Sequence, residues 1–170
     1  MAKSLYGSSG FYGVVLAIEG AGALVGAVVA LRWRPARPLV AAELLSLPWA
    51  LLGAVMALGA PRGVVYAVAV LAGFGIALFG IWWETALAEH IPPQALSRVS
   101  SLDWMGSLAL LPVGYALAGP VSEVVGQREL LVAGGILSAA TLLISLAPRS
   151  VRELGFVTSR SRPLANPGSP

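Results

Sequence analysis

Apolar residues run in five long stretches, separated by shorter polar segments, along this chain of 170 residues. Each stretch has about 20 residues, enough for a helix rising about 1.5 Å per residue to span the roughly 30 Å hydrocarbon core of a bilayer. A membrane barrel is disfavoured, because its strands are segments of about 10 residues with alternating polarity. The pattern predicts an all-α integral membrane protein with transmembrane helices at about 11–31, 39–58, 64–83, 102–125 and 130–147.

Composition supports this fold class and narrows the chemistry. Apolar residues make up 57% of the chain and charged residues 11%. The 20 glycines are typical of membrane helices, where small residues let helices approach closely. There is no cysteine, so disulfides and thiolate chemistry are excluded. The sequence has no phosphate-binding glycine loop, metal-ligand cluster or paired acid and base. We therefore expect no cofactor, no metal and no enzymatic activity.

The two ends of the chain differ from its apolar middle. Residues 1–10 contain one lysine and lack an apolar core followed by a cleavage site, so they do not form a signal peptide. Residues 148–170 are rich in proline, serine, glycine and arginine, which predicts a flexible tail.

The basic residues lie between the spans and predict an orientation. The net charge is +3, but the basic residues form no stripe interleaved with aromatics, so we do not expect nucleic acid as a partner. Successive loops alternate sides, and one side then holds eight arginines: Arg32, Arg34, Arg37, Arg98, Arg149, Arg152, Arg160 and Arg162. The other side holds Lys3, Arg62 and Arg128. The positive-inside rule predicts a multi-pass protein of the plasma or inner membrane, with segment 1–10 outside and tail 148–170 cytoplasmic.

A first helix that enters from outside without a signal peptide is an awkward start for a chain. It is natural for a helix that once followed another. We therefore expect the carboxyl-terminal part of a longer transporter, through truncation, a misplaced start or deliberate cutting.

Three segments carry a resemblance to a known family. They are YGVVLAIEGAGALVGAVVALRWRPARPLV at 12–40, GIWWETALAEHIPPQALSRVSSLDWMGSLALLPVGYALAGPVSEVVG at 80–126 and PRSVREL at 148–154. Together they resemble the last five helices, eight to twelve, of a major facilitator superfamily exporter of the bacterial drug or siderophore type. That resemblance implies two six-helix halves, of which seven helices are absent here, and secondary transport by alternating access.

Two shorter motifs belong to the same resemblance. Residues 26–39 (GAVVALRWRPARPL) resemble a degenerate second copy of the family's cytoplasmic glycine and arginine loop, with Ala30 and Leu31 standing where an acidic residue is expected. Residues 114–120 (GYALAGP) resemble the glycine-proline kink of antiporter helices through Gly114, Gly119 and Pro120, without the paired glycines that should follow. The loop and flanks at 83–104 resemble the equivalent cytoplasmic loop of related exporters.

Glu19 is the acidic residue placed deepest in a predicted span, about 12 Å from the start of its helix. An ionised carboxylate at that depth costs several kcal/mol unless it is paired, hydrated or protonated. It shares a helical face with the small residues Gly22, Gly26 and Ala30. Glu19 is therefore a candidate proton acceptor or ligand for a cationic substrate. The alternative is a neutral carboxyl held by an interhelical hydrogen bond.

Charged residues of both signs gather at the predicted cytoplasmic side. One hypothesis is a gate in which Glu84, Glu89 or Asp103 pairs with Arg32, Arg34, Arg37 or Arg98. The alternative is solvated charge, with Asp103 and Ser100 capping the fourth helix. An aromatic belt accounts best for Trp33, Trp82, Trp83 and Trp104, and we expect His90 to be a solvated loop residue.

Two functions therefore stay open. The first is proton-coupled export of a small amphipathic molecule by alternating access. The second is a non-transporting membrane remnant, scaffold or subunit, completed by a partner chain or as a homo-oligomer. Both have the lipid bilayer as a partner, and only the first has a small-molecule substrate and protons as coupling ions.

Overall fold

The computed structural model describes residues 10–149, and nearly all of them are helical. Within these residues six helices follow one another: α2 (Gly10–Arg32), α3 (Pro38–Ala57), α4 (Arg62–His90), α5 (Pro93–Ala109), α6 (Leu111–Val125) and α7 (Gln127–Ser145). Taken with α5 and α6 as one continuous stretch, they make five helices long and apolar enough to cross a membrane. This confirms the all-α fold and supports the membrane assignment, and the first, second and fifth predicted spans match α2, α3 and α7 within three residues.

The polar loop predicted between the third and fourth spans is wrong. The third span does not end at 83, because α4 runs to His90, and α5 begins at Pro93. Residues 85–89 are mostly good helix formers, which prolong α4, while Pro93 suits the first turn of a helix and disfavours helical backbone before it. Asp103 consequently lies well inside α5, and the predicted cap with Ser100 is also wrong.

A proline divides the fourth span into two helices. Pro112 has no backbone N–H to donate to the carbonyl of Leu108, and its ring crowds that carbonyl. The helix is interrupted at Leu110 and resumes at Leu111. Pro120, by contrast, lies inside α6 without ending it, and α6 stops at Gly126, whose φ of 99° few other residues adopt.

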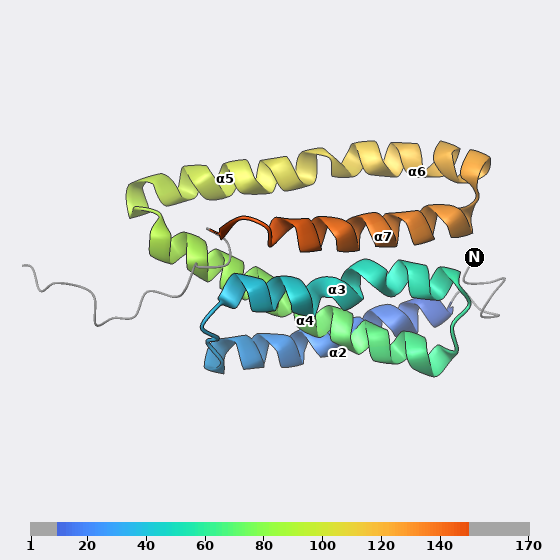
Figure 1. Cartoon of the computed structure of the whole chain (residues 1–170), viewed down its shortest axis with the longest axis horizontal. Coiled ribbons are helices and arrows are strands. Elements are labelled where there is room, and N and C mark those ends of the chain that lie inside the picture. Colours follow the sequence, from blue (N-terminus) through green and yellow to red (C-terminus); the bar gives the residue numbers. More distant parts are fainter. Residues whose placement is uncertain (1–9, 150–170) are drawn as a thin grey trace, which may run out of the picture.

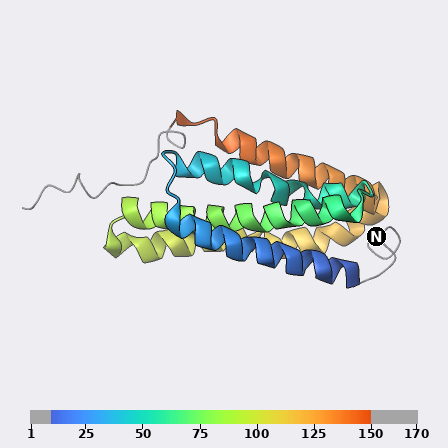
Figure 2. The same cartoon turned by 90° about the horizontal axis from the view of Figure 1, so that it is seen from below.

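Three helices form the packed centre of the molecule. α2 and α4 lie side by side and run in the same direction, while α3 runs antiparallel to both (Figure 1). α7 packs against the outer side of α3, so that α7, α3, α4 and α2 follow one another across the bundle (Figure 2). The α5 and α6 pair lies alongside and contacts the rest mainly near its connections.

Glycines set the distance between the central helices. A Cβ at Gly22 would meet the Val70 carbonyl oxygen, and one at Gly26 would meet that of Phe74 at 2.5 Å. From the other side, Gly73 of α4 faces the backbone carbonyl of Glu19. Since any side chain here would strike backbone, the close approach of α2 and α4 depends on these glycines.

Two apolar clusters lie on either side of this glycine contact. One contains Phe11, Val15, Val65 and Ala69, and the other contains Ala30, Ala42, Leu78 and Trp82. In contrast, no residue of α5 or α6 is buried. The large apolar side chains of those two helices, such as Tyr115 and Val124, are therefore left for lipid or another protein to cover.

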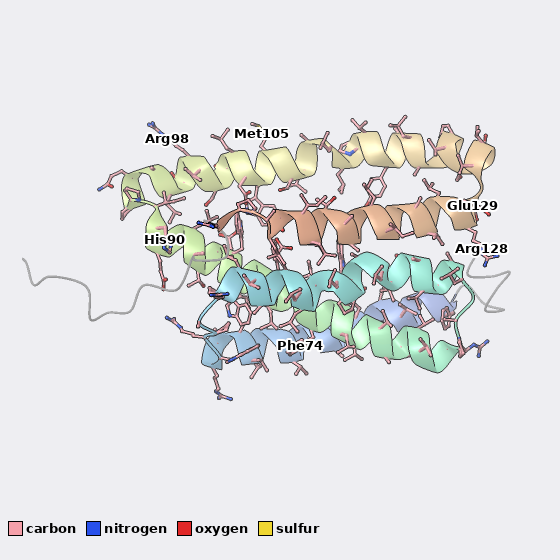
Figure 3. The ribbon with its side chains drawn as sticks, viewed as in Figure 1. Phe74, His90, Arg98, Met105, Arg128 and Glu129 are labelled. Carbon is pink, nitrogen blue, oxygen red and sulfur yellow. The ribbon has the colours of Figure 1, made fainter. Side chains whose placement is uncertain are left out.

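The two ends of the bundle differ in charge. Among residues 10–149, one end carries Arg32, Arg34, Arg37, Arg98 and Arg149, and the opposite end carries Arg62 and Arg128 (Figure 3). We call the first of these the arginine end. The predicted gate residues also lie at the arginine end, except Glu84 and Asp103, which lie deeper in α4 and α5.

Candidate functional site

Glu19 lies near the middle of a membrane-spanning helix. It is about 14 Å from the start of α2, a helix of about 34 Å, and its side chain is half-buried. Its backbone carbonyl faces Gly73, so the residue sits where α2 and α4 are closest. Within residues 10–149 its carboxylate makes no hydrogen bond or ion pair. The structure therefore does not show the alternative, a Glu19 carboxyl held by an interhelical hydrogen bond.

A second carboxylate inside a span escaped the sequence reasoning. Glu43 lies in α3, half-buried, with its side chain close to Ser145 of α7, whose hydroxyl donates to the Leu142 carbonyl at 2.7 Å. The Oε2 atom of Glu43 is buried and has no partner among the described residues. The signal was available, because one acidic residue within the apolar stretch 39–58 is by itself unusual in a membrane helix.

The arginine end contains one pair from the predicted gate. Arg34 Nη1 lies 3.8 Å from Glu89 Oε1 and joins the α2–α3 connection to the last turn of α4. The Arg34 side chain is 62% exposed and that of Glu89 is 21% exposed. A pair this accessible is worth well under about 1 kcal/mol, so it can open at little cost.

The other predicted gate residues are not paired with one another. In the described part of the chain, Arg32, Arg37, Glu84, Arg98 and Asp103 have no ion pair. Asp103 instead accepts a hydrogen bond from Trp83 Nε1 at 3.1 Å, which links α5 to α4. The carboxylate of Asp103 therefore bridges two helices without meeting a basic side chain.

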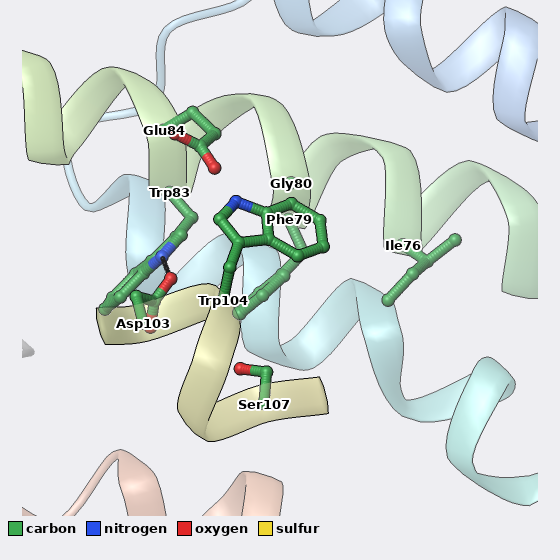
Figure 4. A pocket seen from close by; sticks show the side chains of 8 residues that line it. All are labelled: Ile76, Phe79, Gly80, Trp83, Glu84, Asp103, Trp104 and Ser107. Carbon is green, nitrogen blue, oxygen red and sulfur yellow. Dashed lines mark hydrogen bonds between the residues drawn. The ribbon is translucent and has the colours of Figure 1, made fainter. Parts of the chain in front are cut away.

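A pocket of about 320 Å³ opens beside this hydrogen bond, between α4 and α5. It is lined by Ile76, Phe79, Gly80, Trp83, Glu84, Asp103, Trp104 and Ser107 (Figure 4). The rings of Phe79 and Trp83 are parallel, with centroids 6.2 Å apart. Two carboxylates and three aromatic rings thus share one small cavity, a combination that the sequence did not predict because α4 was expected to end there.

Tryptophans near the arginine end have different roles. Trp82 is only 1% exposed and packs edge-on against Trp33, with ring centroids 5.4 Å apart. Its assignment to an interfacial belt is therefore wrong, because it packs in an apolar cluster with Ala30 of α2 and Ala42 of α3. His90 is exposed, as expected, but it ends α4 instead of lying in a loop, and its Nδ1 donates to the Ala86 carbonyl at 2.9 Å.

The residues of the predicted kink, Gly114, Gly119 and Pro120, all lie in α6. A Cβ at Gly114 or Gly119 would meet no atom within 4 Å. Both glycines therefore lack the close helix contact that Gly22 and Gly26 make. Residues 10–149 also contain no group of three or more His, Asp or Glu side chains placed to hold a metal ion.

Comparison with known proteins finds no matching family model, curated protein or solved structure. The family resemblance therefore depends on the residues quoted from the sequence.

Proposed function

We propose that this chain carries out secondary transport of a small molecule across a cell membrane, coupled to protons, in the manner of a major facilitator exporter. The five apolar helices supply the membrane domain that such a function requires. The observation that carries the proposal is Glu19, an acidic side chain without a partner among residues 10–149, near the middle of a span.

The chemistry of such a residue suits proton coupling. An ionised carboxylate in the bilayer core costs several kcal/mol, and binding a proton or a cation removes much of that cost. Glu19 also lies where α2 and α4 meet through glycine, so a shift of one helix against the other changes its surroundings. In alternating access, such a shift would expose the carboxylate first to one side and then to the other.

The excess of arginine at the arginine end favours a cytoplasmic location for that end. The Arg34–Glu89 pair is then a contact at the cytoplasmic mouth, weak enough to break during each cycle. In the resemblance, α2 to α7 correspond to helices eight to twelve of the full transporter.

Glu19→Gln tests whether this carboxylate carries the coupling proton. In cells that express the chain and are loaded with a fluorescent cationic dye, we expect dye efflux driven by the proton gradient. The amide cannot carry the proton, so the initial efflux rate of Glu19→Gln should fall at least tenfold, to that of cells with an empty vector.

A matched control is Glu123→Gln, the same change at an exposed carboxylate in the last turn of α6. It should keep the efflux rate within twofold of the unaltered chain. Membrane insertion of all three proteins is verified by fractionation. Efflux no faster than the empty vector from an inserted chain would contradict transport by these helices alone, and unchanged efflux in Glu19→Gln would remove Glu19 from the coupling step.

A second function, a non-transporting subunit or scaffold, is favoured by a different observation. The α5 and α6 pair spans 33 residues without burying one, whereas α2, α3 and α4 each bury five or more. A partner chain or a second copy would cover this face. Co-purification of a stable oligomer that shows no efflux would support this second function.

A further inference from the structure

The pocket between α4 and α5 has walls suited to a positive charge. Phe79 and Trp83 form one parallel pair of rings on α4, and Trp104 adds a third ring from α5 (Figure 4). The faces of aromatic rings attract cations, and more strongly where water is scarce. Ile76 adds an aliphatic side chain to this lining.

The charged groups of the pocket are all acidic. Glu84 reaches it from α4 and Asp103 from α5, and no lysine or arginine is among the lining residues. Neither carboxylate has an ion pair within residues 10–149. The hydrogen bond from Trp83 Nε1 fixes one oxygen of Asp103, and the carboxylate keeps lone pairs for a second donor.

This combination selects among cations. Hard metal ions such as Ca²⁺ take six or more oxygen ligands and gain little from indole rings, whereas the pocket offers two carboxylates and one hydroxyl, that of Ser107. An organic ammonium gains from the rings through its alkyl carbons and from the carboxylates through its charge. A volume of about 320 Å³ admits a small group of this kind.

We propose that the α4–α5 pocket binds an alkylammonium group. Two sources share this chemistry, a free amine and the headgroup of an ammonium-bearing lipid. The pocket lies between the middle of α4 and the arginine end and is open at its rim, where Trp104 is 53% exposed. The binding site stands apart from Glu19 and does not depend on transport.

The test uses the purified full chain in discs of phosphatidylglycerol, a lipid without an ammonium group. Choline and its uncharged isostere 3,3-dimethyl-1-butanol are titrated by calorimetry. Because the two have nearly the same shape, the site should bind choline at least tenfold more tightly. Asp103→Asn, which removes charge while keeping an oxygen for Trp83, and Trp104→Ala should each weaken choline binding at least fivefold.

Two variants serve as controls outside the pocket. Glu123→Gln removes an exposed carboxylate of α6, and Trp49→Ala removes a tryptophan of α3 that is 49% exposed. Both should bind choline as the unaltered chain does. Thermal unfolding of each variant establishes that it is folded. Equal binding of choline and the isostere, or unchanged affinity in folded Asp103→Asn, would overturn the proposal.

A second set of discs identifies the source of the ligand. Discs that also contain phosphatidylcholine present the ammonium on a lipid. If a headgroup occupies the pocket, apparent choline affinity falls in these discs, and Trp104→Ala reduces the difference between the two disc types. If affinity is the same in both, the site takes a free amine. Either result presupposes the choline preference and supports the ammonium site.

Discussion

Trp82 is the largest side chain that the bundle buries completely. It lies with Ala30, Ala42 and Leu78 in the apolar cluster nearer the arginine end, where α2, α3 and α4 meet. Its Nε1 atom is buried and has no hydrogen-bond partner among residues 10–149. The residue therefore stabilises the fold through the volume and surface of its ring, while its N–H contributes nothing favourable.

Substitution of Trp82 separates these two contributions. Trp82→Ala should lower the free energy of unfolding by about 3–5 kcal/mol, because it leaves a cavity between three helices. Trp82→Phe keeps an aromatic ring and removes the unpartnered donor, so its cost should be much smaller. Thermal unfolding in detergent measures both, with the exposed Trp49→Ala as control. A Trp82→Ala protein as stable as the unaltered chain would show that the ring is not packed as described.

At the scale of the element, the α2–α4 pair is defined by contact between backbones. Gly22 and Gly26 lie on one face of α2, and Val70 and Phe74 present their carbonyls to that face. Gly20 lies two residues before Gly22, on about the opposite side of α2, and a Cβ there would have nothing within 4 Å. A side chain therefore has room at Gly20 and has none at Gly22.

This difference predicts opposite effects of the same substitution. Gly20→Ala gains helix propensity and should leave the melting temperature unchanged or raise it. Gly22→Ala places a methyl group against backbone and should cost about 1–3 kcal/mol, as overpacking does. Melting temperatures of the two variants in one detergent make the comparison. Equal effects would mean that α2 and α4 do not approach each other through Gly22.

For the whole molecule, connectivity places alternate loops at opposite ends of the bundle. Connections 33–37 and 91–92 lie at the arginine end, and those at 58–61 and 126 lie at the opposite end. The orientation proposed here places the arginine end in the cytoplasm. Since the chain has no cysteine, single introduced thiols report sidedness without background.

Two such thiols test the orientation. A membrane-impermeant maleimide applied to intact cells should label Gln127→Cys and leave Ala36→Cys unlabelled, because both positions are exposed but lie at opposite ends. After permeabilisation, Ala36→Cys should label as well. The reverse pattern in intact cells would place the arginine end outside.

The sequence alone indicated the membrane class and placed the first, second and fifth spans within three residues of the helices. The bilayer core requires each residue to be apolar or to have its polar groups hydrogen-bonded. A run of about 20 such residues can therefore be recognised in the sequence without knowing which helices pack together. Glu19 was found for the same reason, as an exception within a run. Glu43 is also an acidic residue within an apolar run, so the same reasoning could have found it.

Tertiary structure decided which helices meet and which side chains they bring together. Glycine spacing on 22 and 26 indicated a close partner, but only the packed bundle identifies it as α4. The charges of residues 84–101 led to the wrong prediction of one long loop. The boundary between α4 and α5 is instead set by the prolines at 92 and 93. Once α4 continues past Trp83, Asp103 comes within 3.1 Å of its indole. Contacts between residues far apart in the chain depend on helix ends and crossings, which no local pattern of hydrophobicity encodes.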